Sequence, residues 1–191
     1  ETVSRSFSRV DILVNNAGVS QRSLVYETPV EVDRMIMETD FFGAVALTKA
    51  ILPKMISQGG GHLVTISSMT GLYGFPMRSA YASAKHALRG FFETLGLELW
   101  NKNIRVTLVY PGRVHTDVSI NSLDKEGKPY GIMDPGQARG IPVEVCARKI
   151  IRAVECDKKT LLIGSGEIFL YAMRKFFPPL FYRIARKISA T

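Results

Sequence analysis

The sequence has few cysteines and no long apolar run. Cys146 and Cys156 are its only cysteines, too few and too far apart for a disulfide framework or a zinc knuckle. We therefore expect a reducing compartment and two small core side chains. The longest uncharged stretch, residues 63–77, contains serine, threonine, glycine and proline and falls short of the roughly 18 apolar residues that a membrane-spanning helix needs. These absences exclude a disulfide-rich secreted domain and predict no spanning helix.

Motifs of several enzyme classes are also missing. The three histidines, His62, His86 and His115, lack metal-ligand spacing, and there is no Gly-x-Ser-x-Gly motif, so neither a metal site nor a serine nucleophile is predicted. A phosphate-binding glycine loop must follow a strand and open a helix. Glycines 59–61 precede a predicted strand instead, and residues 164–166 follow one but lack the third glycine of the motif. We interpret both clusters as turns.

The composition is that of a globular protein, with 46% hydrophobic and 22% charged residues, which favours one compact domain. Half of the net charge of +8 lies in residues 164–191, which hold five basic residues, one acid and six aromatic residues around Pro178-Pro179. This pattern is typical of a segment that lies in a membrane interface, or that packs on its own core or on a dimer partner. Nucleic acid is disfavoured as a partner because no recognised motif accompanies the charge.

The hydrophobic pattern alternates between strands and helices. Short apolar runs rich in β-branched residues predict buried strands over residues 11–15, 62–67, 104–110 and 160–163. Apolar residues at helical spacing predict long helices over residues 28–52, 79–100 and 142–155. Thr28, Pro29 and Glu31 predict a capping box at the start of the first helix. The order predicts an α/β fold with an open, doubly wound parallel sheet.

Residues 117–140 show neither the apolar runs of the predicted strands nor the helical spacing of apolar residues, and they contain several glycines and prolines. In a compact domain, a loop of this length is usually a lid or a substrate-binding segment, and disorder is the alternative.

Three residues could together carry chemistry. Ser68 follows the second predicted strand, at the edge of a parallel sheet where ligands bind. Tyr81 and Lys85 are four residues apart at the start of the next helix and therefore share a face. A free phenol ionises near pH 10, roughly three units from neutrality, and an ammonium group beside it favours the phenolate. A serine hydroxyl there could orient a carbonyl oxygen. The set indicates acid–base chemistry on a carbonyl compound.

Four segments, in this order, resemble the short-chain dehydrogenase/reductase family. They are Asn15-Asn16-Ala17-Gly18, Ser68, Tyr81-x-x-x-Lys85 and Pro111-Gly112-Arg113-Val114-His115-Thr116. Residues 83–87, 130–134 and 142–145 are similar to its subgroup of members 7 and 7B. The resemblance implies a Rossmann-like catalytic domain over residues 1–163, including the 117–140 loop, with residues 164–191 as a basic, aromatic tail.

The resemblance also implies an NAD(P)-dependent oxidoreductase and assigns catalytic roles. Tyr81 would be the general acid and base, Lys85 would favour its ionised form and hold the nicotinamide ribose, and Ser68 would position the substrate carbonyl. The substrate would be an apolar carbonyl compound or secondary alcohol, such as a steroid, a retinoid or another lipid-like molecule.

For the cofactor, the resemblance implies NADP or NAD, and the subgroup favours NADP. Asn16, Ala17 and Gly18 would lie along its adenosine side, with Thr116 and the Val114 backbone near the nicotinamide amide.

Two departures from the family pattern carry expectations of their own. Asp40 stands where the family has an asparagine of the proton relay, so we expect its carboxylate to pair with Lys85, weaken the effect of Lys85 on Tyr81 and slow turnover. The family's first strand, glycine-rich turn and following helix have no counterpart before Asp11. We therefore expect either a piece of a longer enzyme or a shortened, non-catalytic binding or membrane-associated module.

Overall fold

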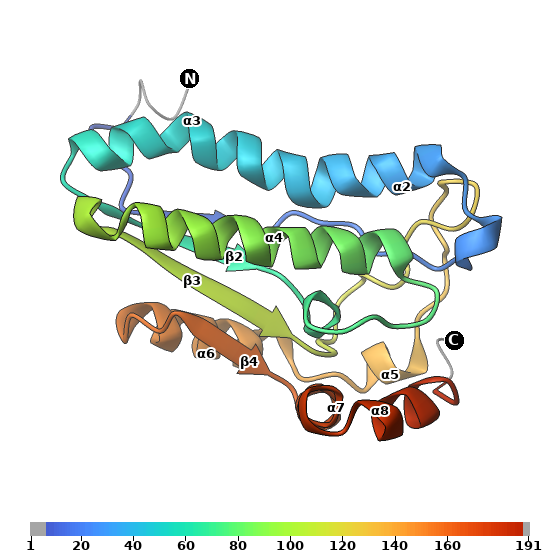
Figure 1. Ribbon diagram of the computed structural model, residues 1–191. Helices are drawn as coiled ribbons and strands as arrows, with labels where there is room; N and C mark the ends of the chain where they lie inside the picture. Colours follow the sequence, from blue (N-terminus) through green and yellow to red (C-terminus); the bar gives the residue numbers. More distant parts are fainter. Residues whose placement is uncertain (1–6, 189–191) are drawn as a thin grey trace.

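The computed structural model describes residues 7–188 as helices around one parallel sheet (Figure 1). Its strands are β1 (Ile12–Asn15), β2 (Gly61–Ile66), β3 (Ile104–Pro111) and β4 (Thr160–Ile163). They lie in the order β1-β2-β3-β4, and every neighbouring pair is parallel. The predicted α/β fold and all four predicted strands are therefore confirmed, and all the carboxyl ends of the strands lie at one edge of the sheet.

Helices cover both faces of the sheet, as Figure 1 shows. Helices α3 (Gly43–Ser57) and α4 (Ser79–Glu98) lie on one face, and α6 (Val143–Glu155) lies on the other. This arrangement explains why the strands read as continuous apolar runs, since a parallel sheet covered on both faces has no solvent-facing side. The edge strand β1 is the exception, because Ile12 and Val14 are about half exposed.

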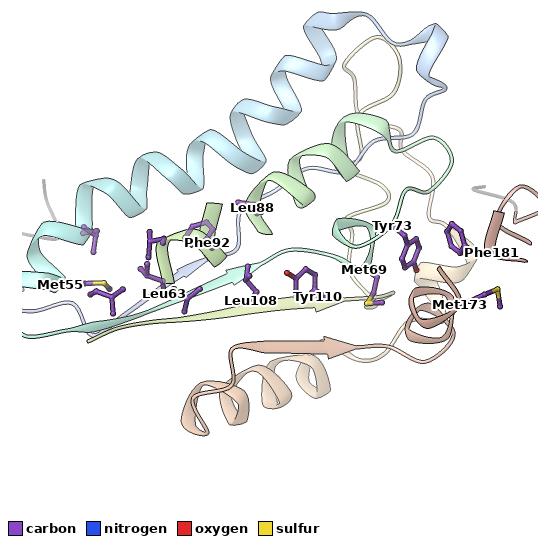
Figure 2. Close-up of a cluster of buried hydrophobic side chains, with 14 of the residues drawn as sticks. Met55, Leu63, Met69, Tyr73, Leu88, Phe92, Leu108, Tyr110, Met173 and Phe181 are labelled. Atoms are coloured by element: carbon purple, nitrogen blue, oxygen red, sulfur yellow. The ribbon is translucent and has the colours of Figure 1, made fainter. Parts of the chain in front are cut away.

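Successive strand residues point to opposite faces and so divide the core in two. Leu63 and Leu108 pack beneath α3 and α4 in the main core, whereas Val64 and Val109 pack against α6. Figure 2 shows the main core as a row of side chains between the sheet and α4. Cys146 fills part of the α6 side as expected, but Cys156 is exposed just beyond the end of α6, so its expected place in the core is wrong.

The first long helix differs from its prediction in two ways. It consists of α2 (Val30–Met37), a π-helical turn (Glu38–Phe42) and α3, and it begins two residues after Thr28. The predicted capping box is wrong, because α2 has no side-chain cap and the Thr28 hydroxyl instead donates to the Leu24 carbonyl at 2.8 Å, with Ser23 Oγ 2.7 Å away. These local acceptors take the hydroxyl away from the helix.

The loop of residues 117–140 contains only a short helix, α5 (Pro135–Ala138). Its backbone is attached to the segment after β1: the Leu123 N–H donates to Ser20 O and the Arg22 N–H donates to Leu123 O, each at 2.8 Å. The loop therefore lies beside residues 20–22, close to the carboxyl edge of the sheet. Short 3₁₀ turns complete the fold at Val25–Glu27, Met69–Gly71 and Trp100–Lys102.

The C-terminal segment folds back onto the main core. Helices α7 (Gly166–Phe176) and α8 (Pro178–Ala185) bury Met173 and Phe181, and the rings of Tyr73 and Phe181 meet edge to face at 5.6 Å (Figure 2). The opposite side of the segment carries exposed aromatic residues. Among residues 7–188, no helix combines the length and the apolar character needed to cross a membrane.

Candidate active site

A cavity of about 490 Å³ lies at the carboxyl ends of the first three strands. Asn16 and Gly18 line it after β1, Ser68 lines it after β2, and Val114 and Thr116 line it after β3. This edge is where ligands of open parallel sheets bind. The structure thus brings together most of the residues singled out in the sequence, while Ala17 is not part of the lining.

Tyr81 and Lys85 complete this cavity from the first turns of α4. Their four-residue spacing places them on one face of the helix, with Lys85 Nζ 5.5 Å from the centroid of the Tyr81 ring. Tyr81 is partly exposed and Lys85 is buried. A cation is therefore held beside a phenol that faces an open cavity.

Gln21 fixes the start of α4 from a distant part of the chain. The helix has no side-chain cap of its own at Arg78. Instead, the fully buried Gln21 accepts hydrogen bonds through Oε1 from the backbone N–H of Ala80 at 2.8 Å and of Tyr81 at 3.4 Å. These contacts satisfy two of the N–H groups that every helix leaves free at its start. Gln21 thus orients the turn that carries Tyr81, which the sequence pattern did not indicate.

Lys85 forms a buried ion pair with Asp40. Asp40 Oδ2 lies 3.1 Å from Lys85 Nζ, with the two side chains 0% and 4% exposed, so the contact expected from the sequence is present. Asp40 Oδ1 also accepts a hydrogen bond from the Val19 N–H at 2.7 Å. Burial raises the pKa of the Asp40 carboxyl, while the charge of Lys85 and the Val19 hydrogen bond oppose that rise.

Two local features bring Asp40 and Lys85 together. Asp40 belongs to the π-helical turn, in which the Gly43 N–H bonds to Glu38 O five residues back. Gly18 crosses directly over the pair, and a Cβ atom at this position would lie 2.9 Å from Lys85 Nζ and 3.0 Å from Asp40 Oδ2. A larger residue in place of this glycine would therefore have to displace the ion pair.

Ser68 begins the 3₁₀ turn after β2, two residues beyond the end of the strand. Its Oγ accepts hydrogen bonds from the Thr70 backbone N–H at 3.2 Å and from Thr70 Oγ1 at 3.1 Å. Since the oxygen accepts twice, the hydroxyl proton is free to point at a ligand. Ser68 and Tyr81 also line a second, smaller cavity, so they stand between the two.

The second cavity, of about 160 Å³, mixes apolar and charged side chains. Arg22, Arg78 and Asp134 form a buried cluster there. The Nη2 atoms of Arg22 and Arg78 lie 3.0 and 3.6 Å from Asp134 Oδ2. Burial, followed by the charge of Arg22, lowers the pKa of the Arg78 guanidinium to about 10. Nothing in the sequence pattern indicates this cluster, since Arg22 and Asp134 are 112 positions apart.

Two further missed residues brace the segment after β3. Gln137 Nε2 donates to Val114 O and, at 3.4 Å, to Thr116 Oγ1. Glu167 Oε1 accepts a hydrogen bond from the Arg113 N–H at 3.1 Å. Only Asp134 has a local signal in the sequence, because it caps α5 through the Gly136 and Gln137 N–H groups immediately before a Pro at the first helical position.

The larger cavity fits the nicotinamide end of the expected cofactor. It presents the amide of Asn16, the hydroxyl of Thr116 and the ammonium of Lys85, groups that can bond to ribose hydroxyls and to a carboxamide. Gly18 leaves the floor of the cavity without a side chain. These residues could hold a nicotinamide and its ribose beside Tyr81.

Comparison with known proteins agrees with this geometry. The family model described as short chain dehydrogenase matches residues 1–127. Dehydrogenase/reductase SDR family member 7B of Xenopus laevis is 45% identical over 177 residues, covering 92% of this chain and 55% of that protein. The Drosophila melanogaster protein named family protein 7-like is 38% identical over 182 residues, covering 95% and 56%. The chain thus spans little more than half the length of these curated relatives.

Solved structures show the same Rossmann-like fold. A short-chain dehydrogenase from Burkholderia cenocepacia, in complex with NADP, superposes with a TM-score of 0.80 at 20% identity, covering 96% of this chain and 72% of that one. A short-chain dehydrogenase from Streptomyces avermitilis gives 0.74 at 28% identity, covering 97% and 74%.

Proposed function

The chain belongs to the short-chain dehydrogenase/reductase family, and from that premise we propose that it serves as an NAD(P)-dependent oxidoreductase of a carbonyl compound or secondary alcohol. One observation carries the proposal. Ser68, Tyr81 and Lys85 line a single cavity together with residues that follow β1 and β3. This is the arrangement that acid–base chemistry on a carbonyl bound beside a cofactor requires.

Each of the three residues has a distinct task in this proposal. Ser68 donates its free hydroxyl proton to the carbonyl oxygen and so orients the substrate. Tyr81 gives its phenolic proton to that oxygen as the alcohol forms, and takes it back in the opposite direction. Lys85 holds a positive charge 5.5 Å from the ring, which favours the phenolate that remains. Asp40 weakens this effect by pairing with Lys85.

The proposed cofactor is NADP or NAD. When bound, it supplies a hydride to the carbonyl carbon, or accepts one from the alcohol carbon. Lys85 and Tyr81 would hold the nicotinamide ribose, Thr116 and the Val114 backbone its carboxamide, and Asn16 and Gly18 the adjoining part. NADP is preferred on the resemblance to the member 7 and 7B subgroup, and the Burkholderia cenocepacia structure contains NADP.

Calorimetric titration with NADPH and NADH, followed by turnover assays on small ketones, tests the proposal. Tyr81→Phe should lower kcat by about 100-fold or more, with a much smaller loss of cofactor affinity because Lys85 still holds the ribose. The matched control is Tyr26→Phe, which alters an exposed ring outside the cavity and should behave as wild type. The same assays are run on a form extended at its N-terminus, and if neither form binds a dinucleotide or reduces a ketone, the proposal is wrong.

For the C-terminal segment we propose contact with an anionic membrane surface. Phe169, Phe176 and Phe177 are about two-thirds exposed on α7 and just after it, beside Arg174 and Lys175. Exposed aromatic side chains among basic ones suit the interface of an anionic bilayer.

Flotation with phosphatidylcholine vesicles, with and without phosphatidylserine, tests this contact. Binding should require the anionic lipid and should be lost in Phe176→Ser/Phe177→Ser. Trp100→Ser, which changes an exposed ring at the end of α4, is the control. The alternative is a homodimer surface. It would be identified if the wild-type chain does not float with vesicles, sediments as a dimer, and becomes a monomer in the double variant.

A further inference from the structure

We propose that Arg22 and Arg78 form an anion-binding subsite in the smaller cavity, and that the substrate carries a carboxylate or phosphate group close to its reacting carbonyl. The substrate part of this inference rests on the proposed function. The anion-binding part does not, because it concerns only the two guanidinium groups and can be measured without turnover.

The two arginines share one carboxylate. Both approach Asp134 Oδ2, and their side chains are only 4% and 10% exposed. Asp134 Oδ1 is already engaged, since it accepts the N–H groups of Gly136 at 2.7 Å and Gln137 at 3.1 Å. Among the described residues, no other carboxylate lies within ion-pair distance of either guanidinium. The cluster therefore has one buried positive charge in excess.

The remaining charged groups around the cavity do not restore the balance. Arg113 adds a third positive charge, and Glu167 adds one negative charge. The Glu167 carboxylate is used by the backbone N–H groups of Arg113 and Ser165. Burying a charged group without a partner costs free energy, because the group loses its hydration. A bound counter-charge offsets this cost. An anionic ligand is the partner that this cluster lacks.

The guanidinium groups also retain the means to bind such a ligand. Each has five N–H donors in a planar fork that matches carboxylate and phosphate oxygens. Arg78 donates one hydrogen bond, from Nη1 to Pro76 O at 3.2 Å, and its Cζ atom lies 5.4 Å from the Phe75 ring centroid. Arg22 is anchored by Gln21 O and by Asp134. Both groups are thus held in place, with donors left for a ligand in the cavity.

The position of the cluster ties it to the reacting group. Arg78 lies immediately before α4, three residues ahead of Tyr81, and both line the smaller cavity with Ser68. An anion bound by Arg78 would therefore share this cavity with the carbonyl that Ser68 and Tyr81 orient. Met69 and Leu170 supply apolar lining for the rest of the molecule. The chemistry described is an apolar carbonyl compound with a nearby acidic group.

Calorimetry on the whole chain, with octanoate, octyl phosphate and octanol as probes, tests the subsite. The two anions should bind at least about tenfold more tightly than octanol, and Arg78→Gln should remove that preference. The tighter of the two anions identifies the acidic group. Arg89→Gln, which alters an exposed arginine on the same helix, should leave all three affinities unchanged. Equal binding of octanol and the anions would overturn the inference.

A second measurement separates ligand binding from a structural role. If Arg78 serves only to hold Asp134, Arg78→Gln should lower the stability of the chain without ligand. If Arg78 instead carries the unpaired charge that binds a ligand, the variant should be as stable as wild type or more stable, because Asp134 remains paired with Arg22. The reaction is then tested by comparing the turnover of two ketones that differ only in the presence of a carboxylate. Anion binding without turnover contradicts only the proposed function, whereas turnover without preference for the acid contradicts the subsite.

Discussion

Replacing Asp40 with asparagine should speed the proposed reaction and weaken the fold. The change removes one negative charge at nearly constant shape. Lys85 Nζ lies 3.1 Å from Asp40 Oδ2 and 5.5 Å from the Tyr81 ring centroid, so the carboxylate is no farther than about 8.6 Å from that ring. Without it, the positive charge of Lys85 acts on Tyr81 unopposed.

Coulomb's law gives the size of the effect. At 8.6 Å, a unit charge contributes about 2 kcal/mol at an effective dielectric constant of ~20, and about 0.5 kcal/mol in bulk water. Since Tyr81 faces an open cavity beside a buried pair, the gain should lie between these limits. Asp40→Asn should therefore raise the turnover rate at neutral pH by about 2-fold to about 25-fold.

Stability should move in the opposite direction. Lys85 is 4% exposed, and removal of one partner of a buried ion pair leaves an uncompensated charge. Losses of about 3 kcal/mol are typical in that case. The expected result in urea denaturation is a lower midpoint with an unchanged slope.

The assay is initial-rate kinetics from acid to neutral pH on wild type, Asp40→Asn and Asp33→Asn. Asp33 is a carboxylate on α2 that makes no contact with Lys85 and serves as the control. Because burial raises the pKa of Asp40, wild type protonates this group as the pH falls and comes to resemble the asparagine variant. The gap in rate should close toward acid pH. A folded Asp40→Asn protein no faster than wild type at neutral pH would refute the reasoning.

Three further predictions concern stability. Gln21→Met leaves two N–H groups at the start of α4 without acceptors and should cost about 2 kcal/mol in urea denaturation; a change within error would contradict the capping role. Gly71→Ala should cost about 1–3 kcal/mol, because the new Cβ would lie 2.8 Å from Lys85 O, whereas Gly74→Ala meets nothing within 4 Å and should be neutral. Burial lowers the pKa of His62, so the unfolded chain takes up the proton first, and stability should fall by up to about 1.4 kcal/mol per unit below about pH 6.5. His62→Gln should flatten that slope, and an equal slope in the variant would exclude His62 as its source.

The sequence predicted the sheet well because its signals are local. Each strand is a short run of branched apolar residues between turns, and burial on both faces makes the whole run apolar. The Tyr81 and Lys85 pair was equally accessible, since a spacing of four on a helix determines a shared face. Asp40 was found only as a departure from a family pattern, and its contact with Lys85 followed from charge.

The missed residues depend on contacts between distant parts of the chain. Gln21 reaches Ala80 across 59 positions, and Arg22 reaches Asp134 across 112. Neither pair has a period or a motif, so nothing in the sequence brings them together before the fold does. The Thr28 cap failed for a different reason, because neighbouring acceptors at Ser23 and Leu24 took its hydroxyl. Which of several nearby acceptors a hydroxyl bonds to depends on the path of the backbone, and a sequence motif does not specify that path.

The π-helical turn at Glu38–Phe42 sets the phase between the two helices that it joins. A turn closed by a five-residue hydrogen bond holds about one residue more than an α-helical turn, so it advances everything after it by about 100° relative to an unbroken helix. Removal of the exposed Thr39 would restore an ordinary helix and rotate either Asp40 away from Lys85 or α3 away from the sheet. The number of residues in this turn thus determines two things at once, the position of the Asp40 carboxylate and the packing of α3 on the sheet. Neither can change without the other.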